Sequence, residues 1–121
     1  MGAPAAGAVV LVRFPFSDLS QSKSRPAVVL ADAGRGDRVL CQITSKPYGD
    51  ARAIRLEQSA FASGSLRVTS YVRPGKLFTA SGDIVAKEVG SLTSEALTRV
   101  VDAITDLLRG TAPKPLETTE D

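Results

Sequence analysis

At 121 residues the chain has room for one hydrophobic core, so we expect a single domain. Hydrophobic residues make up 43% and charged residues 23%, which is typical of a globular protein and excludes a disordered or membrane-spanning class. The formal net charge is only +2, and the first seven residues carry no charged side chain, unlike a signal peptide, so we expect the protein to stay in the cytoplasm.

The body of the chain consists of short β-branched runs separated by clusters of Gly, Pro, Asp and Ser. This pattern is typical of an all-β sandwich or barrel. In chain order, the predicted strands are 8–14, 27–31, 38–44, 53–56, 66–72 and 76–79.

Alternation of apolar and polar residues assigns faces within two of these strands. In 38–45 the apolar residues of one side are expected to face the core, whereas Gln42 and Thr44 face outward. In 66–73 the even-numbered side is predicted to be core and the odd-numbered side to be wet. Cys41, the only cysteine, lies on an inner face, so we expect a plain core residue and neither a disulfide nor a cysteine-rich zinc site.

Residues 93–109 form the one strong predicted helix. Their apolar side chains recur at three- and four-residue steps and make a single stripe, which indicates a helix packed on the barrel. Thr93 is a favourable N-cap, and Gly110 ends the helix. We therefore predict one domain over residues 1–110 and a disordered polar tail over 111–121.

The charges are unevenly distributed along the chain. Residues 13–76 contain eleven Lys/Arg and five Asp/Glu, whereas the remainder contains four Lys/Arg and eight Asp/Glu. A basic region on a balanced small protein is the expected footprint for a polyanion. The alternative is that these charges are ordinary solvated strand faces.

Two polar clusters could carry chemistry. The first, SDLSQSKSRP (17–26), joins two predicted strands, and Pro26 favours an extended Arg25 at a strand edge. The second, ITSK (43–46), ends another predicted strand and offers two hydroxyls and a cation. Either cluster alone could also be a solvated loop.

The available groups are guanidinium, ammonium and hydroxyl, because the chain has no histidine and no carboxylate cluster suited to a metal. We therefore expect no metal and no cofactor. Such a set can cleave single-stranded RNA, since RNA carries its own nucleophile, the 2′-OH, and the protein need only align it and stabilise the phosphate. Arginine offers a planar fork of donors to phosphate oxygens. DNA lacks the 2′-OH and would resist this route.

Four motifs occur in order: GAVVLVRFPFSD (7–18), SRPAVVL (24–30), CQITSK (41–46) and SYVRPGKLFT (70–79). Together they resemble the MazF/PemK (Kid) toxins of toxin–antitoxin pairs, over about residues 7–109. The resemblance implies a mainly β fold, a small SH3-like or CcdB-like β-barrel with a C-terminal α-helix. It further implies a homodimer, a cognate antitoxin partner, and sequence-specific cleavage of single-stranded mRNA that leaves a 2′,3′-cyclic phosphate.

The same resemblance implies roles for individual residues. Arg25 would stabilise the scissile phosphate, Thr44 would support the same catalytic site, and Arg73 matches another arginine of the family's site. Further RNA contacts are expected from Lys23 and Lys46 to flanking phosphates, from Gln42 or Ser45 to a base or ribose, from Ser24, and from Phe16 at the mouth of the groove.

The chain also departs from the family's pattern. Some members carry a histidine in the first loop and an aspartate two positions after the later arginine, but here the loop has no histidine and Gly75 stands in the aspartate's place. Ala8 stands where an acid commonly follows the opening glycine. We therefore expect an arginine and threonine site, in which Arg25 acts by electrostatics and positioning, because a permanently charged guanidinium is a poor general base.

Two other functions stay open at this point. One is a CcdB-like toxin that binds gyrase, and the other is a catalytically weak RNA-binding or antitoxin-sequestering relative. The sequence favours the endoribonuclease over the gyrase-binding toxin, which would not need the motifs around Arg25 and Thr44 together.

Overall fold

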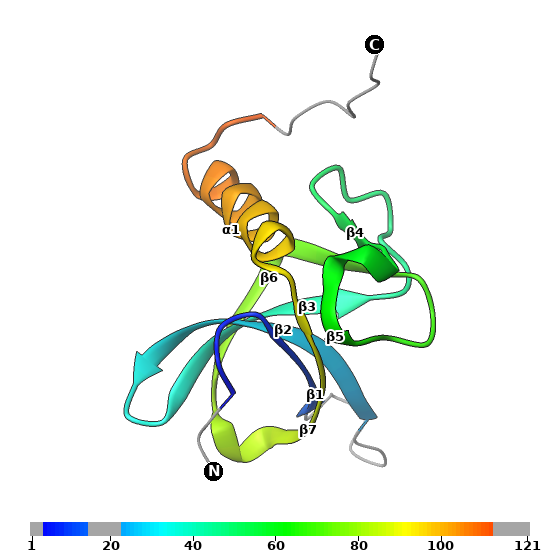
Figure 1. The fold of residues 1–121 in the computed structure, drawn as a ribbon. Coiled ribbons are helices and arrows are strands. Elements are labelled where there is room, and N and C mark those ends of the chain that lie inside the picture. The colour runs from blue at the N-terminus through cyan, green and yellow to red at the C-terminus, as the bar shows by residue number, and fades with distance from the viewer. Residues whose placement is uncertain (1–3, 15–22, 113–121) are drawn as a thin grey trace.

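The computed structural model of the protein describes residues 4–14 and 23–112. Its strands and helix are β1 (Ala8–Phe14), β2 (Lys23–Gly34), β3 (Asp37–Thr44), β4 (Ile54–Leu56), β5 (Phe61–Gly64), β6 (Ser70–Ser81), β7 (Val85–Leu92) and α1 (Ser94–Leu108). All strand pairs are antiparallel and form one sheet in the order β4-β6-β3-β2-β1-β7-β5. The sheet curls into an open half-barrel, and α1 lies against one side of it (Figure 1). The expected mainly β fold with a C-terminal α-helix is confirmed.

The core is divided into two clusters that lie on opposite faces of the sheet. In β1, Val9 belongs to the cluster that contains the buried residues of α1, whereas Val10 and Val12 belong to the second cluster, inside the curl. Central strands are therefore covered on both faces, by the helix on one side and by the curled sheet on the other. Strands buried on both faces read as nearly continuous apolar runs rather than as clean alternation.

This arrangement corrects the expected faces of β3. Leu40 is buried in the second cluster, and Thr44 is also buried, with 8% of its surface exposed. Gln42 is half-buried. The expectation that Gln42 and Thr44 simply face outward is wrong for Thr44, because the curl of the sheet encloses the face that a flat sheet would leave in water.

The two predicted strands at 66–72 and 76–79 are one strand, β6, with an interruption. The pairs Ile43–Val72 and Cys41–Leu77 are two residues apart along β3 but five residues apart along β6, so β6 contains three extra residues between them. An odd number of extra residues reverses which face each later side chain occupies. Residues 66–69 precede the strand, and Val68 is 61% exposed, so its predicted place in the core is wrong.

Strands β5 and β7 were not among the predicted strands. The predicted helix is confirmed to within one residue at each end, and the hydroxyl of its N-cap, Thr93, accepts a hydrogen bond from the N–H of Ala96 at 3.1 Å. Within the described residues no helix is long and apolar enough to cross a membrane. Most of the predicted disordered tail, residues 113–121, lies outside the described residues.

Candidate functional site

A row of polar side chains crosses the sheet on the face opposite to α1. Thr44 on β3 pairs with Tyr71 on β6, and Tyr71 pairs in turn with Arg55 on β4. Residues opposite each other in antiparallel strands point to the same side. The adjacent pair Ile43–Val72 belongs to the cluster under α1, so Thr44, Tyr71 and Arg55 point the other way.

The two proposed catalytic residues lie on this same face, at the same end of the strand pair β2–β3. The last pairing between these strands joins Ala27 to Gln42. Arg25 lies two residues before Ala27 and Thr44 two residues after Gln42, so each shares the face of its neighbour. The Arg25 side chain is exposed. We use "site face" below for Arg25, Gln42, Thr44, Tyr71 and Arg55.

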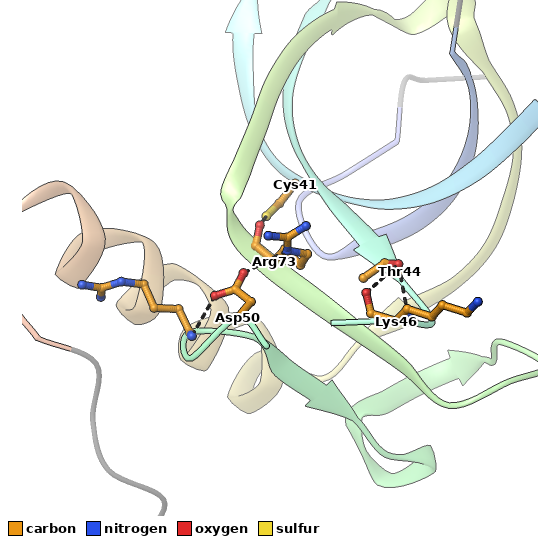
Figure 2. A network of polar contacts seen from close by, with 6 residues as sticks. Cys41, Thr44, Lys46, Asp50 and Arg73 are labelled. Carbon is orange, nitrogen blue, oxygen red and sulfur yellow. Dashed lines mark hydrogen bonds and ion pairs between the residues drawn. The ribbon is translucent and has the colours of Figure 1, made fainter. Parts of the chain in front are cut away.

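The Thr44 hydroxyl organises the turn that follows β3. It donates a hydrogen bond to the carbonyl oxygen of Lys46 at 3.2 Å and accepts one from the Lys46 N–H at 3.1 Å (Figure 2). This turn carries Ser45 and Lys46, both exposed, away from the buried end of the strand. Thr44 therefore fixes the backbone on which these two side chains stand.

Arg73, at the interruption in β6, is held by a carboxylate from another part of the chain. Its Nε donates to Oδ2 of Asp50 at 2.9 Å, and Figure 2 shows the two side chains pointing toward one another. The second carboxylate oxygen, Oδ1, accepts the backbone N–H of Arg52 at 2.9 Å. Both side chains of the pair are largely buried, at 23% exposed for Arg73 and 16% for Asp50. The pair ties the loop after β3 to β6.

The surroundings of Asp50 set its protonation state. Burial on its own raises the pKa of this carboxyl, but the hydrogen bond from Arg73, the N–H of Arg52 and the charges of both arginines outweigh burial, and the pKa is lowered. Asp50 is therefore ionised at neutral pH. A carboxylate of lowered pKa holds a guanidinium well but is a weak general base.

Cys41 lies next to this pair and is chemically quiet. It is fully buried, and its Sγ donates to the carbonyl oxygen of Arg73 at 3.0 Å. Burial, together with the charge of Asp50, raises the pKa of the Cys41 thiol to about 12. The prediction of a plain core cysteine is confirmed, since such a thiol is not a nucleophile near neutral pH.

The remaining predicted RNA contacts lie in different places. Ser24 is exposed on β2, next to Arg25. Lys23 begins β2, where its backbone lies opposite Phe14. Phe16 and the first part of the predicted loop, 17–22, lie outside the described residues. The structure thus brings Arg25, Gln42 and Thr44 to one face, and places Arg73 in the ion pair beside them.

Sequence reasoning missed Tyr48 and Asp50, which lie in the turn after β3. The signal was the string Pro-Tyr-Gly-Asp (47–50), because Pro, Gly and Asp together are typical of a tight turn. Among the described residues, no group of three or more His, Cys, Asp and Glu side chains comes together in a way that could hold a metal.

The comparisons with known proteins identify the family. A family model described as "PemK-like, MazF-like toxin of type II toxin-antitoxin system" matches residues 5–108. The chain belongs to this family of toxins. The comparison with curated protein sequences gave no match.

Solved structures with the same fold include several toxins. A MazE–MazF crystal structure from Deinococcus radiodurans superposes with a TM-score of 0.74 at 21% identity, covering 90% of this chain and 98% of that one. A structure named an endoribonuclease from a mycobacterial species gives 0.65 at 20% identity, covering 95% and 98%. A mycobacterial endoribonuclease in complex with its cognate antitoxin gives 0.66 at 16% identity, covering 93% and 98%. At these identities the similarity establishes the fold.

Proposed function

We propose that the protein is a sequence-specific endoribonuclease toxin that cuts single-stranded mRNA without a metal ion. The observation that carries the proposal is the placement of Arg25 and Thr44 on one face, at one end of the β2–β3 pair, in a chain of this toxin family. Exposed Lys46 adds positive charge beside them, whereas Arg55 and Arg73 are paired with Glu57 and Asp50. A basic face of this kind suits the phosphate backbone of RNA.

In the proposed reaction the RNA supplies the nucleophile. The 2′-oxygen attacks the adjacent phosphorus while the bond from phosphorus to the 5′-oxygen breaks, leaving a 2′,3′-cyclic phosphate and a 5′-OH. The 2′-OH loses one proton and the 5′-oxygen gains one, so the reaction neither releases nor consumes protons. Arg25 donates to the non-bridging phosphate oxygens, where negative charge grows in the transition state. Thr44 keeps the turn with Ser45 and Lys46 in register with that phosphate.

The decisive variant is Arg25→Ala. We expect purified protein to cleave a long single-stranded RNA in the presence of EDTA and to spare DNA of the same sequence. Arg25→Ala should lower the cleavage rate by about 100-fold or more, as loss of one transition-state donor does elsewhere. The matched control is Arg109→Ala, at the exposed end of α1, which should cleave like the unaltered protein.

Three outcomes would contradict the proposal. Full activity in Arg25→Ala would remove that residue from the mechanism. RNA that stays intact while DNA gyrase is inhibited would support the gyrase-binding alternative. RNA that is bound and never cut would support the catalytically weak relative. Sequencing of the cut ends would give the cleavage sequence.

We further propose that the toxin is a homodimer and binds a cognate antitoxin. The related fold occurs in a mycobacterial endoribonuclease described as in complex with its cognate antitoxin. An extended acidic and apolar segment laid over the site face would order as it binds and would compete with RNA for the same positive charge. A small acidic protein that co-purifies with the toxin and blocks RNA cleavage is the expected observation.

A further inference from the structure

The turn after β3 places an aromatic residue in an unusual backbone conformation. The Asp50 N–H donates to the Pro47 carbonyl oxygen at 3.0 Å, which closes a four-residue turn, and its two central residues, Tyr48 and Gly49, have φ of +55° and +73°. Positive φ at both central positions is the signature of a type I′ turn. That turn favours Asn-Gly, whereas a bulky side chain at positive φ is an outlier.

Burial does not explain why a tyrosine stands there. Tyr48 is 73% exposed, so its ring is not held in place by a hydrophobic core. Strained backbone conformations cluster at catalytic and binding sites, so the outlier at Tyr48 suggests a functional role for its ring.

The contact beneath the ring comes from Arg73. The guanidinium carbon of Arg73 lies 5.9 Å from the centroid of the Tyr48 ring, within the range of a cation–π contact. Asp50, from the same turn as Tyr48, fixes that guanidinium at 2.9 Å. The ring, the guanidinium and the carboxylate therefore form one unit, which we call the Tyr48 platform.

The Tyr48 platform stands close to the site face. The Thr44 hydroxyl fixes Lys46, and the turn begins at the next residue, Pro47. The Lys46 side chain is exposed between the two. Tyr48 lies four residues from Thr44, which is at most about 14 Å of extended chain, so a short stretch of RNA with its cleaved phosphate near Thr44 could reach the ring.

We propose that Tyr48 is a base-stacking residue, whose exposed ring, steadied by the Arg73–Asp50 pair, binds an unpaired nucleobase beside the cleaved phosphate. The inference rests on the proposed function, because it names the contact that this site makes with its RNA. Aromatic rings stack on any base face, so the contact adds affinity and positions the strand while other groups read the sequence.

The test uses two substitutions and a ligand that cannot be cut. Tyr48→Asn removes the ring but supplies the residue that a type I′ turn prefers, so the turn is kept. Tyr48→Phe keeps the ring and removes the hydroxyl. The ligand is a single-stranded 2′-fluoro RNA oligonucleotide, which lacks the attacking hydroxyl. We expect Tyr48→Asn to weaken the Kd by about 5- to 100-fold, as loss of one stacked base does, with Tyr48→Phe close to the unaltered protein.

The melting temperature separates a binding role from a structural one. Tyr48→Asn should melt at the same temperature as the unaltered protein or higher, because the strained residue has been replaced. A lower melting temperature would show that the ring holds the loop together, and it would contradict the inference. An unchanged Kd in Tyr48→Asn would contradict it directly.

A spectroscopic signal identifies the ring that stacks. The chain has two tyrosines and no tryptophan, so in a Tyr71→Phe variant Tyr48 is the sole source of tyrosine fluorescence. Addition of the 2′-fluoro RNA should quench it, and unchanged fluorescence on binding would count against stacking. Failure of the proposed function looks different: the unaltered protein would bind RNA through Tyr48 and leave it uncut.

Discussion

At the scale of single residues, the pair formed by Asp50 and Arg73 is the contact whose loss we expect to matter most for stability. Asp50→Asn keeps the shape of the side chain and removes its charge, which leaves a mostly buried guanidinium without an ionic partner. We expect the free energy of unfolding to fall by about 1–3 kcal/mol at pH 7. Urea denaturation measures this change. The control is Glu57→Gln, whose ion pair with Arg55 is more than half exposed on both sides and should contribute little.

The pH dependence of this difference has a defined sign. Because the pKa of Asp50 is lowered in the folded protein, the unfolded chain binds a proton more readily. The stability contributed by Asp50 is therefore fully present above its ordinary pKa of 3.8 and is lost as the pH falls through the lower, folded value. The gap between the unaltered protein and Asp50→Asn should close in that acidic range. A gap that stayed constant to lower pH would mean that the lost stability comes from packing and not from charge.

The sequence did not reveal this pair, for a physical reason. Asp50 and Arg73 are 23 residues apart, and each by itself is a common charged residue in a turn or at a strand. Only the pairing of β3 with β6, and the interruption at Arg73, bring them together. The catalytic candidates Arg25 and Thr44 were easier to nominate, because each lies in a motif that resembles a family pattern.

At the scale of elements, two glycines allow β5 and β7 to approach closely. Gly64 pairs with Gly90, and a Cβ added at Gly90 would lie 2.6 Å from the backbone oxygen of Ser63. Backbone cannot move aside as a flexible side chain can, so Gly90→Ala should lower the free energy of unfolding by about 1–3 kcal/mol. At the control position, Gly82, an added Cβ would meet nothing nearer than 3.8 Å, so Gly82→Ala should change stability little. Equal stability of both variants in thermal melts would contradict the close approach.

The same two strands, β5 and β7, lack the sequence signals that made other elements predictable. The bounds of β1, β3 and α1 were predicted almost residue by residue, because each has a clear apolar period or a good cap. In β7 the pairing with β1 shifts register twice, and its middle residues are exposed and polar, so no clean alternation survives. β5 is only four residues long, and three of them are exposed. Both strands are specified by their neighbours more than by their own residues.

At the scale of the whole molecule, the charge asymmetry follows the fold. The basic part of the sequence, residues 13–76, supplies β2, β3, β4 and every residue of the site face, whereas acidic residues dominate the part that forms β7 and α1. Under the proposed function, an RNA strand and an acidic antitoxin segment would both be attracted to the side that carries the site face. The opposite side, carrying α1, is left for contacts that need no positive charge.

That opposite side bears on the predicted homodimer. The buried residues Ala96, Val100 and Ile104 turn one face of α1 to the core, yet Val101 and Leu108 are 42% and 72% exposed. Seven residues apart, they lie on one face of the helix. If a second copy covers this face, Val101→Asp should shift the mass measured by light scattering from dimer toward monomer at micromolar concentration. Such an interface would bury apolar side chains that a monomer leaves in water.

The control for this change lies on the other exposed side of the same helix. Arg99→Asp alters the charge by two units there and should leave the mass unchanged, since Arg99 projects about half a turn away from Val101 and Leu108. Circular dichroism should show a folded helix in both variants, because both positions are exposed. A monomeric mass for the unaltered protein would overturn the homodimer itself. A dimer that survives Val101→Asp would keep the homodimer and move its interface to another surface of the half-barrel.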